Sequence, residues 1–387
     1  MKEFIEGSMA VARGVAVCRP HVVSAYPITP QTHIVEHLSE LVADGILDSQ
    51  FINVESEFGA ASVVLGAAAA GGRAFSATTS QGLLLMGEVL YNISGMRLPL
   101  VITVANRAVS APINIWNDHS DAMVFRDAGW IMLFAEDNQE VHDMHIQAYK
   151  IGETREISLP VMVNMDGFIL THAYEPVDTI SQKDADDFLP PFDPVVKLDV
   201  DNPLTMGPLG EPQWYLETRY RIQQAMLEAK PVVKQVAKEF KEKFGRWYGD
   251  VIDGYRMDDA EIVYVAMGSI CGTIKDTIDE LRDKGEKVGL LKIRMFRPFP
   301  GEEIIDALKD KQKVIVLEKA LSLGASGMLS DEIKAAFYAT PHRPEISSTF
   351  AGLGGRDISK TSLADLYHKV KGERQDNMFV DLKEELV

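Results

Sequence analysis

Cysteine is scarce in this chain, and so are long apolar runs. The 387 residues include only Cys18 and Cys271, which form no C-x-x-C pair. A disulfide framework and a cysteine-ligated iron–sulfur cluster are therefore both excluded within this chain. The longest apolar stretches, such as residues 60–70, are rich in alanine and glycine and too short to cross a bilayer. Residues 1–7 hold acids where a signal peptide would be basic, so we expect a cytoplasmic protein with no membrane partner.

Positive charge is also in deficit. Lysine and arginine number 39 against 57 aspartates and glutamates, which gives a net charge of −18. Nucleic-acid binding needs a basic stripe that neutralises phosphates, so we expect no nucleic-acid partner. The hydrophobic fraction of 46% and the charged fraction of 25% are typical of a globular protein, and the length allows two domains.

The first part of the chain alternates short apolar strands with helical segments. Strands are expected at residues 21–25, 51–54, 74–78, 100–105, 130–135 and 160–164. This alternation predicts a doubly wound, parallel α/β sheet, and we assign it to a first domain of residues 1–171.

A linker and a second α/β unit follow. Residues 172–212 are rich in proline, aspartate and glycine, and residues 217–244 read as a long charged helix that Pro231 should kink or divide. We assign residues 172–252 to this linker, or arm, and helix. The domain from residue 253 to 387 has expected strands at 261–267, 287–293, 313–317 and 345–350.

Residues 25–32, AYPITPQT, join the first expected strand to a helix. We expect Thr29 to be the N-cap and Pro30 the first helical residue, where a missing N–H costs nothing. The free amides of this first turn would then face the carboxyl edge of the sheet, where open α/β folds bind ligands. A well-capped turn without a ligand explains the octapeptide equally well.

Two further strand-to-helix junctions place polar residues at the same edge. Glu57, in SEFGAA, opens an alanine-rich helix, and Ser80 and Gln81 follow the strand at 74–78. Gly59 and Gly82 permit a close approach at these junctions. A helix-start carboxylate favoured by the helix dipole is the structural alternative for Glu57.

Arg107 follows the strand at 100–105 and precedes a long connection containing NDHSD at 117–121. An arginine at this edge can hold a carboxylate with two hydrogen bonds. An ion pair with Asp118 or Asp121 is the alternative. One histidine with two carboxylates in a loop fits a hydrogen-bonded turn better than a metal site, so we expect no metal ligands in this chain.

The motifs YPITP, SEFGAA, SQGLLLM, ANRA and NDHSD, in this order and spacing, resemble the α subunit of the 2-oxoacid:ferredoxin oxidoreductases, most closely the pyruvate branch. The resemblance covers nearly the whole chain. It implies a pyrimidine-binding domain for thiamine diphosphate followed by a domain like the transketolase carboxyl-terminal domain. It also implies oxidative decarboxylation of pyruvate to acetyl-CoA, with coenzyme A as cosubstrate and ferredoxin or flavodoxin as electron acceptor.

The same resemblance assigns roles to individual residues. Glu57 would share a proton with N1′ of the cofactor's aminopyrimidine, Thr29 would contact the substrate, and Arg107 would hold the 2-oxoacid carboxylate. The residues that it places around the cofactor are Tyr26, Pro27, Glu57, Ser80 and Gln81.

One expected motif is missing. Thiamine enzymes hold magnesium and the diphosphate with GDG followed later by NN, and the nearest match here, Gly249-Asp250-Val251, lacks the second glycine and the asparagines. The resemblance therefore implies a β subunit that binds Mg²⁺ and the diphosphate. It also implies γ and ferredoxin-like δ subunits, with [4Fe-4S] clusters in partner chains, and a dimer of heteromers active only as a complex.

Several alternatives stay open at this point. The β subunit of a lipoamide-linked 2-oxoacid dehydrogenase shares the two-domain architecture, although YPITP and SQGLLLM argue against it. A noncatalytic scaffold should have lost Glu57, Thr29 or Arg107. Among substrates, Thr29 argues against oxalate and Ser80-Gln81-Gly82 against 2-oxoglutarate, so 2-oxoisovalerate is second to pyruvate.

Overall fold

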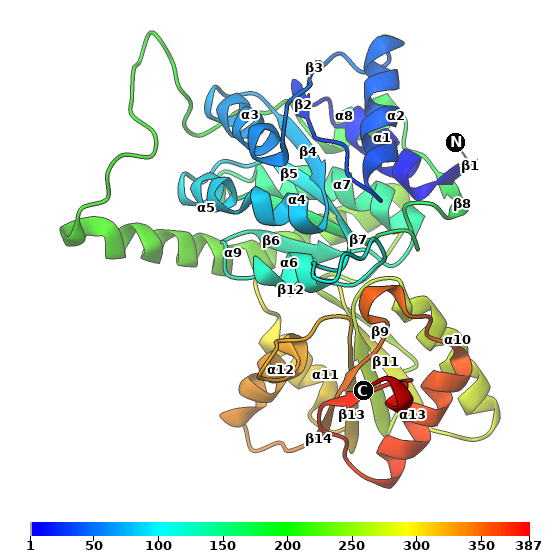
Figure 1. Ribbon diagram of the computed structural model, residues 1–387. Helices are drawn as coiled ribbons and strands as arrows, with labels where there is room; N and C mark the ends of the chain where they lie inside the picture. Colours follow the sequence, from blue (N-terminus) through cyan, green and yellow to red (C-terminus); the bar gives the residue numbers. More distant parts are fainter. Residues whose placement is uncertain (1) are drawn as a thin grey trace.

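Two α/β units lie one above the other in the computed structural model, which describes residues 2–387 (Figure 1). The strands are β1 (Lys2–Glu6), β2 (Val22–Ser24), β3 (Gln50–Ile52), β4 (Ala74–Thr78), β5 (Val101–Asn106), β6 (Ile131–Phe134), β7 (Val161–Asp166), β8 (Tyr174–Asp178), β9 (Ile252–Tyr255), β10 (Ile262–Ala266), β11 (Val288–Ile293), β12 (Met295–Arg297), β13 (Lys313–Glu318), β14 (Glu345–Phe350) and β15 (Met378–Phe379). The helices are α1 (Gly7–Val17), α2 (Thr32–Ala43), α3 (Glu57–Ala69), α4 (Ser80–Leu85), α5 (Gly87–Gly95), α6 (Ser120–Val124), α7 (Asn138–Gly152), α8 (Gln182–Phe188), α9 (Pro212–Phe244), α10 (Ile270–Asp283), α11 (Gly301–Leu308), α12 (Met328–Tyr338) and α13 (Lys360–Gly372), with short 3-10 turns at Leu353–Gly355 and Glu384–Leu386.

The upper unit is built on a seven-stranded sheet. Its strand order is β12-β6-β7-β5-β4-β2-β3, and every neighbouring pair is parallel except β12 with β6. The strands expected in the first part of the chain are all present within a few residues. The predicted doubly wound parallel sheet is therefore confirmed.

The strand order reverses between β2 and β4. From β2 the chain runs outward to β3, and it then returns to the other side of β2 as β4 and continues to β5. In open parallel sheets, ligands bind at such a switch point, outside the carboxyl ends of the strands. The loops after β2 and β4 flank this crevice.

Helices cover both faces of the upper sheet. One buried core joins α1, α2 and α7 to the sheet, and it extends to α9 through side chains such as Val233 and Phe240. The other core lies under α5 and the alanine-rich α3 and continues into the lower unit through Val263 and Leu329. The two units therefore share a continuous apolar core.

The lower unit contains the six-stranded sheet β15-β14-β13-β10-β11-β9, in which only β9 is antiparallel to its neighbour. Strand β12 departs from the expected division of the chain. It lies within the range 253–387 but pairs with β6 of the upper sheet. A local sequence pattern predicts a strand but not the sheet that it joins.

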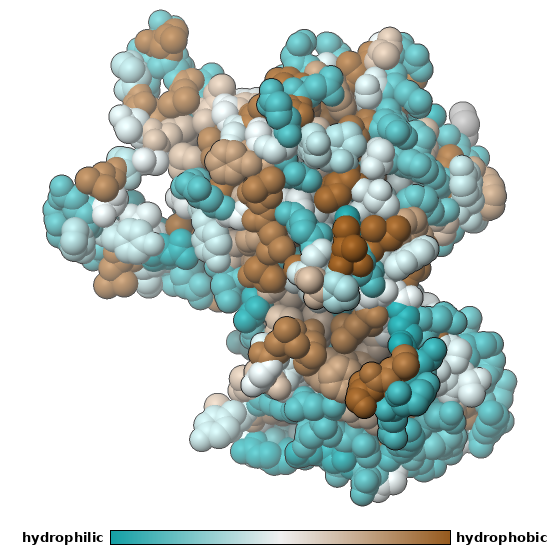
Figure 2. All heavy atoms as spheres, viewed as in Figure 1, coloured by the Kyte–Doolittle hydropathy of each residue, from teal (hydrophilic) through white to brown (hydrophobic). Residues whose placement is uncertain are grey.

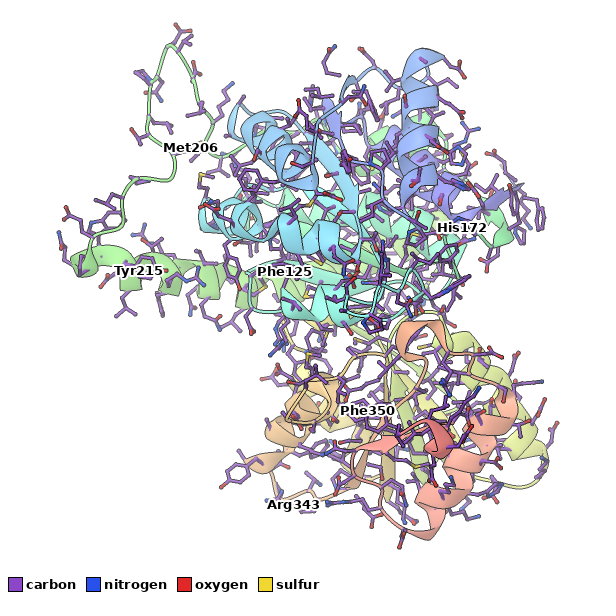
Figure 3. All side chains as sticks on the ribbon, in the orientation of Figure 1. Phe125, His172, Met206, Tyr215, Arg343 and Phe350 are labelled. Carbon is purple, nitrogen blue, oxygen red and sulfur yellow. The ribbon has the colours of Figure 1, made fainter. Side chains whose placement is uncertain are left out.

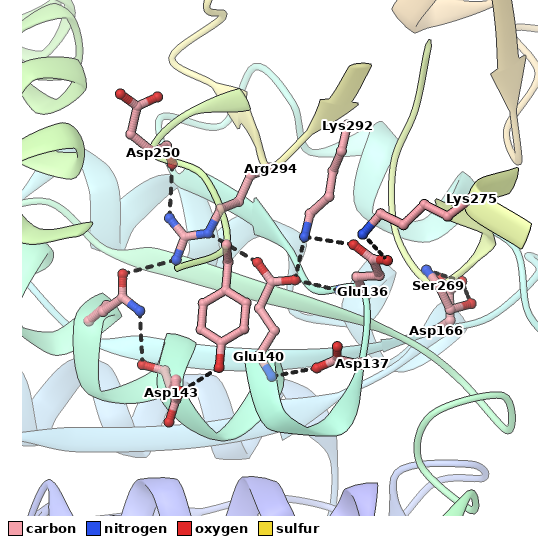
Figure 4. A network of polar contacts seen from close by, with 12 residues as sticks. Glu136, Asp137, Glu140, Asp143, Asp166, Asp250, Ser269, Lys275, Lys292 and Arg294 are labelled. Carbon is pink, nitrogen blue, oxygen red and sulfur yellow. Dashed lines mark hydrogen bonds and ion pairs between the residues drawn. The ribbon is translucent and has the colours of Figure 1, made fainter. Parts of the chain in front are cut away.

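Buried charges also join the units (Figure 4). Glu140 accepts hydrogen bonds from Lys292 Nζ at 2.7 Å and Arg294 Nε at 3.1 Å, and Lys292 also reaches Glu136 at 3.0 Å. Lys275 donates to Glu136 at 2.6 Å. Burial alone would raise the pKa of Glu136, but the two ammonium groups hold it below its usual value.

The linker prediction needs two corrections. Residues 172–212 are not irregular throughout, because β8 pairs with β1 and α8 begins at Gln182 with Ser181 as its N-cap. Helix α9 runs unbroken through Pro231, so the proline does not divide it. From Ile222 onward α9 is packed on the core, and this packing offsets the hydrogen bond that the proline removes.

The first turns of α9, where Tyr215 is labelled in Figure 3, and part of the segment before them project from the upper unit, whereas Leu198 N donates to Ala69 O at 2.7 Å and Met206 packs against the core. Apolar side chains stand exposed there, including Val200, Leu209 and Leu216, and Figure 2 shows brown patches on this projection. Exposed apolar side chains gathered in this way are unusual for a chain that works alone. Separately, no helix in residues 2–387 combines the length and apolar character that a membrane span needs.

Candidate active site

Four adjacent strands of the upper sheet end in residues singled out from the sequence. Arg107 follows β5, Ser80 and Gln81 follow β4, Thr29 lies in the loop after β2, and Glu57 begins the helix after β3. Because these strands are parallel, their carboxyl ends meet at one edge. The structure therefore brings the predicted site residues to the same side of the sheet, around the switch point.

The turn after β2 differs from the expected helix start. Helix α2 begins at Thr32, and Gln31 occupies the cap position, so Thr29 is not the N-cap and Pro30 is not helical. Gln31 is fully buried, and its Nε2 donates to Ala77 O of β4 at 2.7 Å. A side chain that bonds across the crevice fixes this turn, whereas local capping rules consider only the turn's own residues.

Glu57 is the first residue of α3 and is 7% exposed. Ser56 caps the helix by accepting from Gly59 N at 3.2 Å. Within residues 2–387, the Glu57 carboxylate forms no hydrogen bond and no salt bridge. A Cβ atom on Gly82 would lie 2.7 Å from Glu57 Oε1, so glycine is required there to leave room for this carboxylate.

Other buried polar atoms at this edge also lack partners within the described chain. They are Thr78 Oγ1, Gln81 Nε2, Asn106 Oδ1 and Asn117 Oδ1. Most buried polar atoms in proteins are hydrogen-bonded, and each exception needs an explanation. A bound molecule that offers both donors and acceptors would satisfy them.

Arg107 is 5% exposed and is held by backbone carbonyls instead of carboxylates. Its Nη1 donates to Thr29 O at 2.8 Å and its Nε to Asn114 O at 2.8 Å. Nη2 has no partner within residues 2–387. Burial lowers the pKa of Arg107, although the group stays protonated. The predicted alternative of an ion pair is therefore wrong, and one edge of the guanidinium is free for an anion.

Asp121 joins the ends of β4 and β5. It is fully buried and accepts hydrogen bonds from the backbone N–H groups of Ser80 (2.9 Å) and Arg107 (3.0 Å) and from Asn106 Nδ2 (3.0 Å). Burial raises its pKa to about 6 in spite of these donors. Ser80 has a positive φ of 45°, and Asp121 stabilises this strained backbone.

His119 of the NDHSD segment lies beside Asp166, which also contacts Lys319 of the lower unit. His119 Nε2 lies 2.7 Å from Asp166 Oδ1, and Lys319 Nζ lies 3.0 Å from Asp166 Oδ2. Burial would raise the pKa of Asp166, but Lys319 and His119 hold it well below its usual range. Among the described residues no group of three or more histidine, cysteine, aspartate or glutamate side chains is arranged to hold a metal ion.

The remaining predicted residues line the crevice loops. Tyr26 and Pro27 are exposed in the loop after β2, and Thr29 is exposed beside them. Ser80 is buried, and its Oγ donates to Ala108 O at 2.5 Å. The described groups fit an aminopyrimidine ring, because Glu57 and Thr78 Oγ1 offer a partnerless acceptor and hydroxyl next to an accessible loop.

Two residues were missed as site elements from the sequence. Gln31 has no local signal, because its partner lies on a strand 46 residues away. Thr78 is one of two adjacent threonines, and only the structure shows that its hydroxyl is unpartnered while Thr79 bonds Ala105 O. Asp121 was considered only as an ion-pair partner, whereas it actually accepts backbone N–H groups.

A parallel α/β sheet that carries at its carboxyl edge a buried glutamate with no partner among residues 2–387 is followed by a second α/β unit, and this arrangement fits a thiamine diphosphate-binding α/β fold. Residues 13–238 match the family model described as "Pyruvate flavodoxin/ferredoxin oxidoreductase, thiamine diP-bdg". Residues 260–363 match "Pyruvate:ferredoxin oxidoreductase core domain II". The chain belongs to the pyruvate flavodoxin/ferredoxin oxidoreductase family.

Curated relatives resemble the chain over almost its full length. Pyruvate synthase subunit PorA of Methanosarcina barkeri is 54% identical, over 99% of this chain and 97% of the relative. The subunit of the same name from Thermotoga maritima is 49% identical, over 92% and 90%. Ketoisovalerate oxidoreductase subunit VorA of Pyrococcus horikoshii is 44% identical, over 93% and 91%.

A solved structure supports the fold. The 2-oxoglutarate:ferredoxin oxidoreductase from Magnetococcus marinus, determined with 2-oxoglutarate, coenzyme A and succinyl-CoA bound, superposes with a TM-score of 0.72 at 19% identity. The match covers 95% of this chain but spans only 65% of the length of that chain. At this identity the likeness concerns the fold alone.

Proposed function

We propose that this chain is the α subunit of a pyruvate:ferredoxin oxidoreductase. The complex would convert pyruvate and coenzyme A, reversibly, to acetyl-CoA, CO₂ and a proton, with two electrons passing to ferredoxin or flavodoxin. The observation that carries the proposal is that one sheet edge holds both a buried carboxylate, Glu57, which has no partner among residues 2–387, and the buried Arg107 guanidinium, whose Nη2 has none there either. The identities of 54% and 49% to pyruvate synthase subunits support pyruvate as the substrate.

In this proposal residues 1–171 bind the pyrimidine half of the cofactor. Thiamine diphosphate, when bound, supplies the carbon nucleophile that adds to the 2-oxoacid. The Glu57 carboxylate shares a proton with the pyrimidine N1′ when the cofactor is bound, and burial keeps water from competing for that proton. Tyr26, Pro27, Ser80 and Gln81 line the cofactor, and Gln81 Nε2 offers it a buried donor.

Arg107 and Thr29 act on the substrate. The free Nη2 of Arg107 binds the 2-oxoacid carboxylate with a charge-assisted hydrogen bond until CO₂ leaves. Thr29 is exposed beside it, and its carbonyl already bonds Arg107 Nη1 at 2.8 Å. This hydrogen bond therefore keeps Thr29, which contacts the substrate, at a fixed distance from Arg107, which binds the carboxylate.

The chain would work in an assembly, with residues 172–252 as arm and helix and residues 253–387 as the second domain. A β partner would supply Mg²⁺ and the diphosphate site, and γ and δ partners would supply the [4Fe-4S] clusters, in a dimer of heteromers. Two observations support this: the sequence lacks the GDG and NN motif, and apolar side chains project from the arm.

The test is to purify the native complex that contains this chain and to follow coenzyme A-dependent viologen reduction with pyruvate, 2-oxoisovalerate and 2-oxoglutarate. We expect iron–sulfur partners and the highest kcat/KM with pyruvate. A preference for 2-oxoisovalerate would move the chain to the branched-chain enzymes, as the VorA relative allows. A lipoamide acyltransferase partner without viologen reduction would refute the proposal.

A further inference from the structure

A glycine-rich turn of the lower unit contacts the loop that follows Arg107. The turn is Gly352-Leu353-Gly354-Gly355, which follows the end of β14 after Ala351. Asn114 Nδ2 donates to Gly354 O at 3.0 Å, although the two residues are 240 positions apart. Gly354 N donates to Asp118 Oδ2 at 3.2 Å. The turn thus donates one hydrogen bond to this loop and accepts another from it.

The backbone of the turn also packs closely on the loop. A Cβ atom on Gly355 would lie 2.3 Å from Trp116 Cβ, and one on Gly354 would lie 2.6 Å from Asn114 Nδ2. Both glycines have positive φ angles, of 81° and 60°. Glycine is therefore needed here for two independent reasons, the backbone conformation and the close approach.

Asn114 links this turn to the guanidinium of Arg107. Its side chain is bonded on both ends, with Nδ2 on Gly354 O and Oδ1 accepting from Trp116 N at 2.6 Å. Its own carbonyl accepts from Arg107 Nε at 2.8 Å. A displacement of the turn would therefore move the carbonyl that holds Arg107.

A second contact supports the far end of the loop. His119 N donates to Lys319 O at 2.7 Å, just past the end of β13. The Lys319 ammonium reaches back to Asp166 of the upper unit at 3.0 Å. The lower unit therefore holds residues 114–119 at both ends, from the carboxyl ends of its neighbouring strands β13 and β14.

We propose that the turn 352–355 is a specificity-determining element that sets the position of Arg107 through Asn114. One of the two carbonyls on the guanidinium belongs to Thr29 in the upper unit, and the other belongs to a residue fixed by the lower unit. The direction of the free Nη2 is thus set jointly by both units. The inference rests on the proposed function, in which Arg107 Nη2 binds the carboxylate of a small 2-oxoacid. The position of the turn would then decide how much room is left for the side chain of that acid.

The first test is Asn114→Asp in the assembled complex. Aspartate keeps the acceptor for Trp116 N but sets a charged oxygen against Gly354 O, so the Asn114–Gly354 bond is lost while the Gly354 N–Asp118 bond remains. We expect KM for pyruvate to rise roughly threefold to tenfold, the usual effect of one hydrogen bond, with kcat less affected and KM for coenzyme A unchanged. The kcat/KM ratio of pyruvate to 2-oxoisovalerate should also change. Amide hydrogen exchange across residues 108–119 should become faster, which is independent of turnover.

A matched glycine pair provides the control. Gly355 and Gly324 both have a φ of 81°, but a Cβ on Gly324 would meet nothing within 4 Å. Gly355→Ala should reproduce the Asn114→Asp effects, whereas Gly324→Ala should retain the pyruvate KM and the substrate ratio. If the Gly355→Ala chain does not assemble into the complex, the kinetics of Asn114→Asp alone decide whether the inference holds.

The outcomes separate this inference from the function on which it rests. An active unaltered complex whose Asn114→Asp and Gly355→Ala variants behave like Gly324→Ala would overturn the inference alone. An unaltered complex that turns over no 2-oxoacid would instead refute the proposed function. A uniform fall in kcat with unchanged KM and unchanged exchange would also overturn the inference, because it would show only a structural role.

Discussion

The two buried polar regions of this molecule differ in whether their charged side chains form ion pairs. Between the units, Glu140, Lys292 and Arg294 are all at most 2% exposed, and each forms an ion pair with another buried group. At the carboxyl edge of the upper sheet, the Glu57 carboxylate has no partner within residues 2–387, and within those residues the Arg107 guanidinium is bonded only by carbonyls.

This difference distinguishes charged groups that stabilise the structure from charged groups that are available for chemistry. Burying a charge without a partner is costly, and a chain that served only as a scaffold would gain by pairing or replacing it. The paired network contributes to joining two sheets, whereas the unpaired groups keep their hydrogen-bonding capacity for another molecule. The comparison predicts that substitutions in the two regions will have opposite effects on activity and stability.

The largest effect is expected at Glu57. Glu57→Gln should lower turnover of the complex by about 10²- to 10⁴-fold, the usual contribution of general acid–base catalysis. Its free energy of unfolding should stay the same or increase, because a buried charge without a partner is removed. Steady-state kinetics and urea unfolding measure the two effects. Glu55→Gln, two residues away and exposed, is the control and should change neither. Undiminished turnover of Glu57→Gln would refute the chemical role given to this unpaired carboxylate.

The opposite result is expected in the charge network. Glu140→Ala leaves Lys292 and Arg294 buried without this carboxylate, and should lower the free energy of unfolding by about 3–5 kcal/mol. Urea titration of the isolated chain provides the measurement. The matched control is Glu280→Ala, which breaks an exposed pair with Lys360 and should lower the free energy of unfolding far less, because solvent screens this pair. Equal losses from the two variants would contradict the view that the buried network joins the units.

Arg107 sharpens the comparison because it is a buried cation without a carboxylate partner. Arg107→Ala should raise KM for pyruvate roughly 10- to 100-fold, because a hydrogen bond to a charged group contributes about 1.5–3 kcal/mol. The melting temperature should change less than in Glu140→Ala. Arg107→Lys should fall between wild type and alanine, since lysine keeps the charge but not the planar group that spans two carbonyls. An unaltered KM would refute the carboxylate-binding role.

The smallest effect concerns Glu318, which lies between the two classes. It is buried and accepts hydrogen bonds from the N–H groups of Leu329 at 2.7 Å and Ser330 at 3.0 Å, but among residues 2–387 no cation lies within hydrogen-bond distance of it. Burial raises its pKa from 4.5 to about 7. Because the folded pKa is the higher one, the stability that this group contributes is fully present below the unfolded pKa and is lost as pH rises through about 7.

Urea unfolding over a pH series tests this. As pH rises, the free energy of unfolding cannot fall because of Glu318 by more than about 1.4 kcal/mol per pH unit, which is the value for the release of one proton. Glu318→Gln should flatten the decline between the two pKa values. If the wild type and this variant have the same pH dependence, then Glu318 does not titrate in the folded protein as its burial indicates.

Much of the site could be placed from the sequence, because apolar periodicity is a local property. It located the strands that precede Glu57, Ser80 and Arg107, and parallel pairing then put those residues at one edge. The turn around Thr29 was predicted less well. Capping rules favoured Thr29 and Pro30, but the bond from Gln31 to Ala77 places the start of α2 further along the chain.

The sequence by itself determined the order of strands and helices, the deficit of positive charge and the polar residues that follow each strand, since each of these depends on neighbouring residues. Only the tertiary structure decided which of those polar groups have partners. Whether Glu57 is left unpaired, whether Asp121 accepts backbone N–H groups, and whether Asn114 bonds a turn 240 residues away all depend on distances between segments far apart in the chain. Hydrogen bonds form only over short distances and a limited range of angles, so their partners are decided by the folded structure.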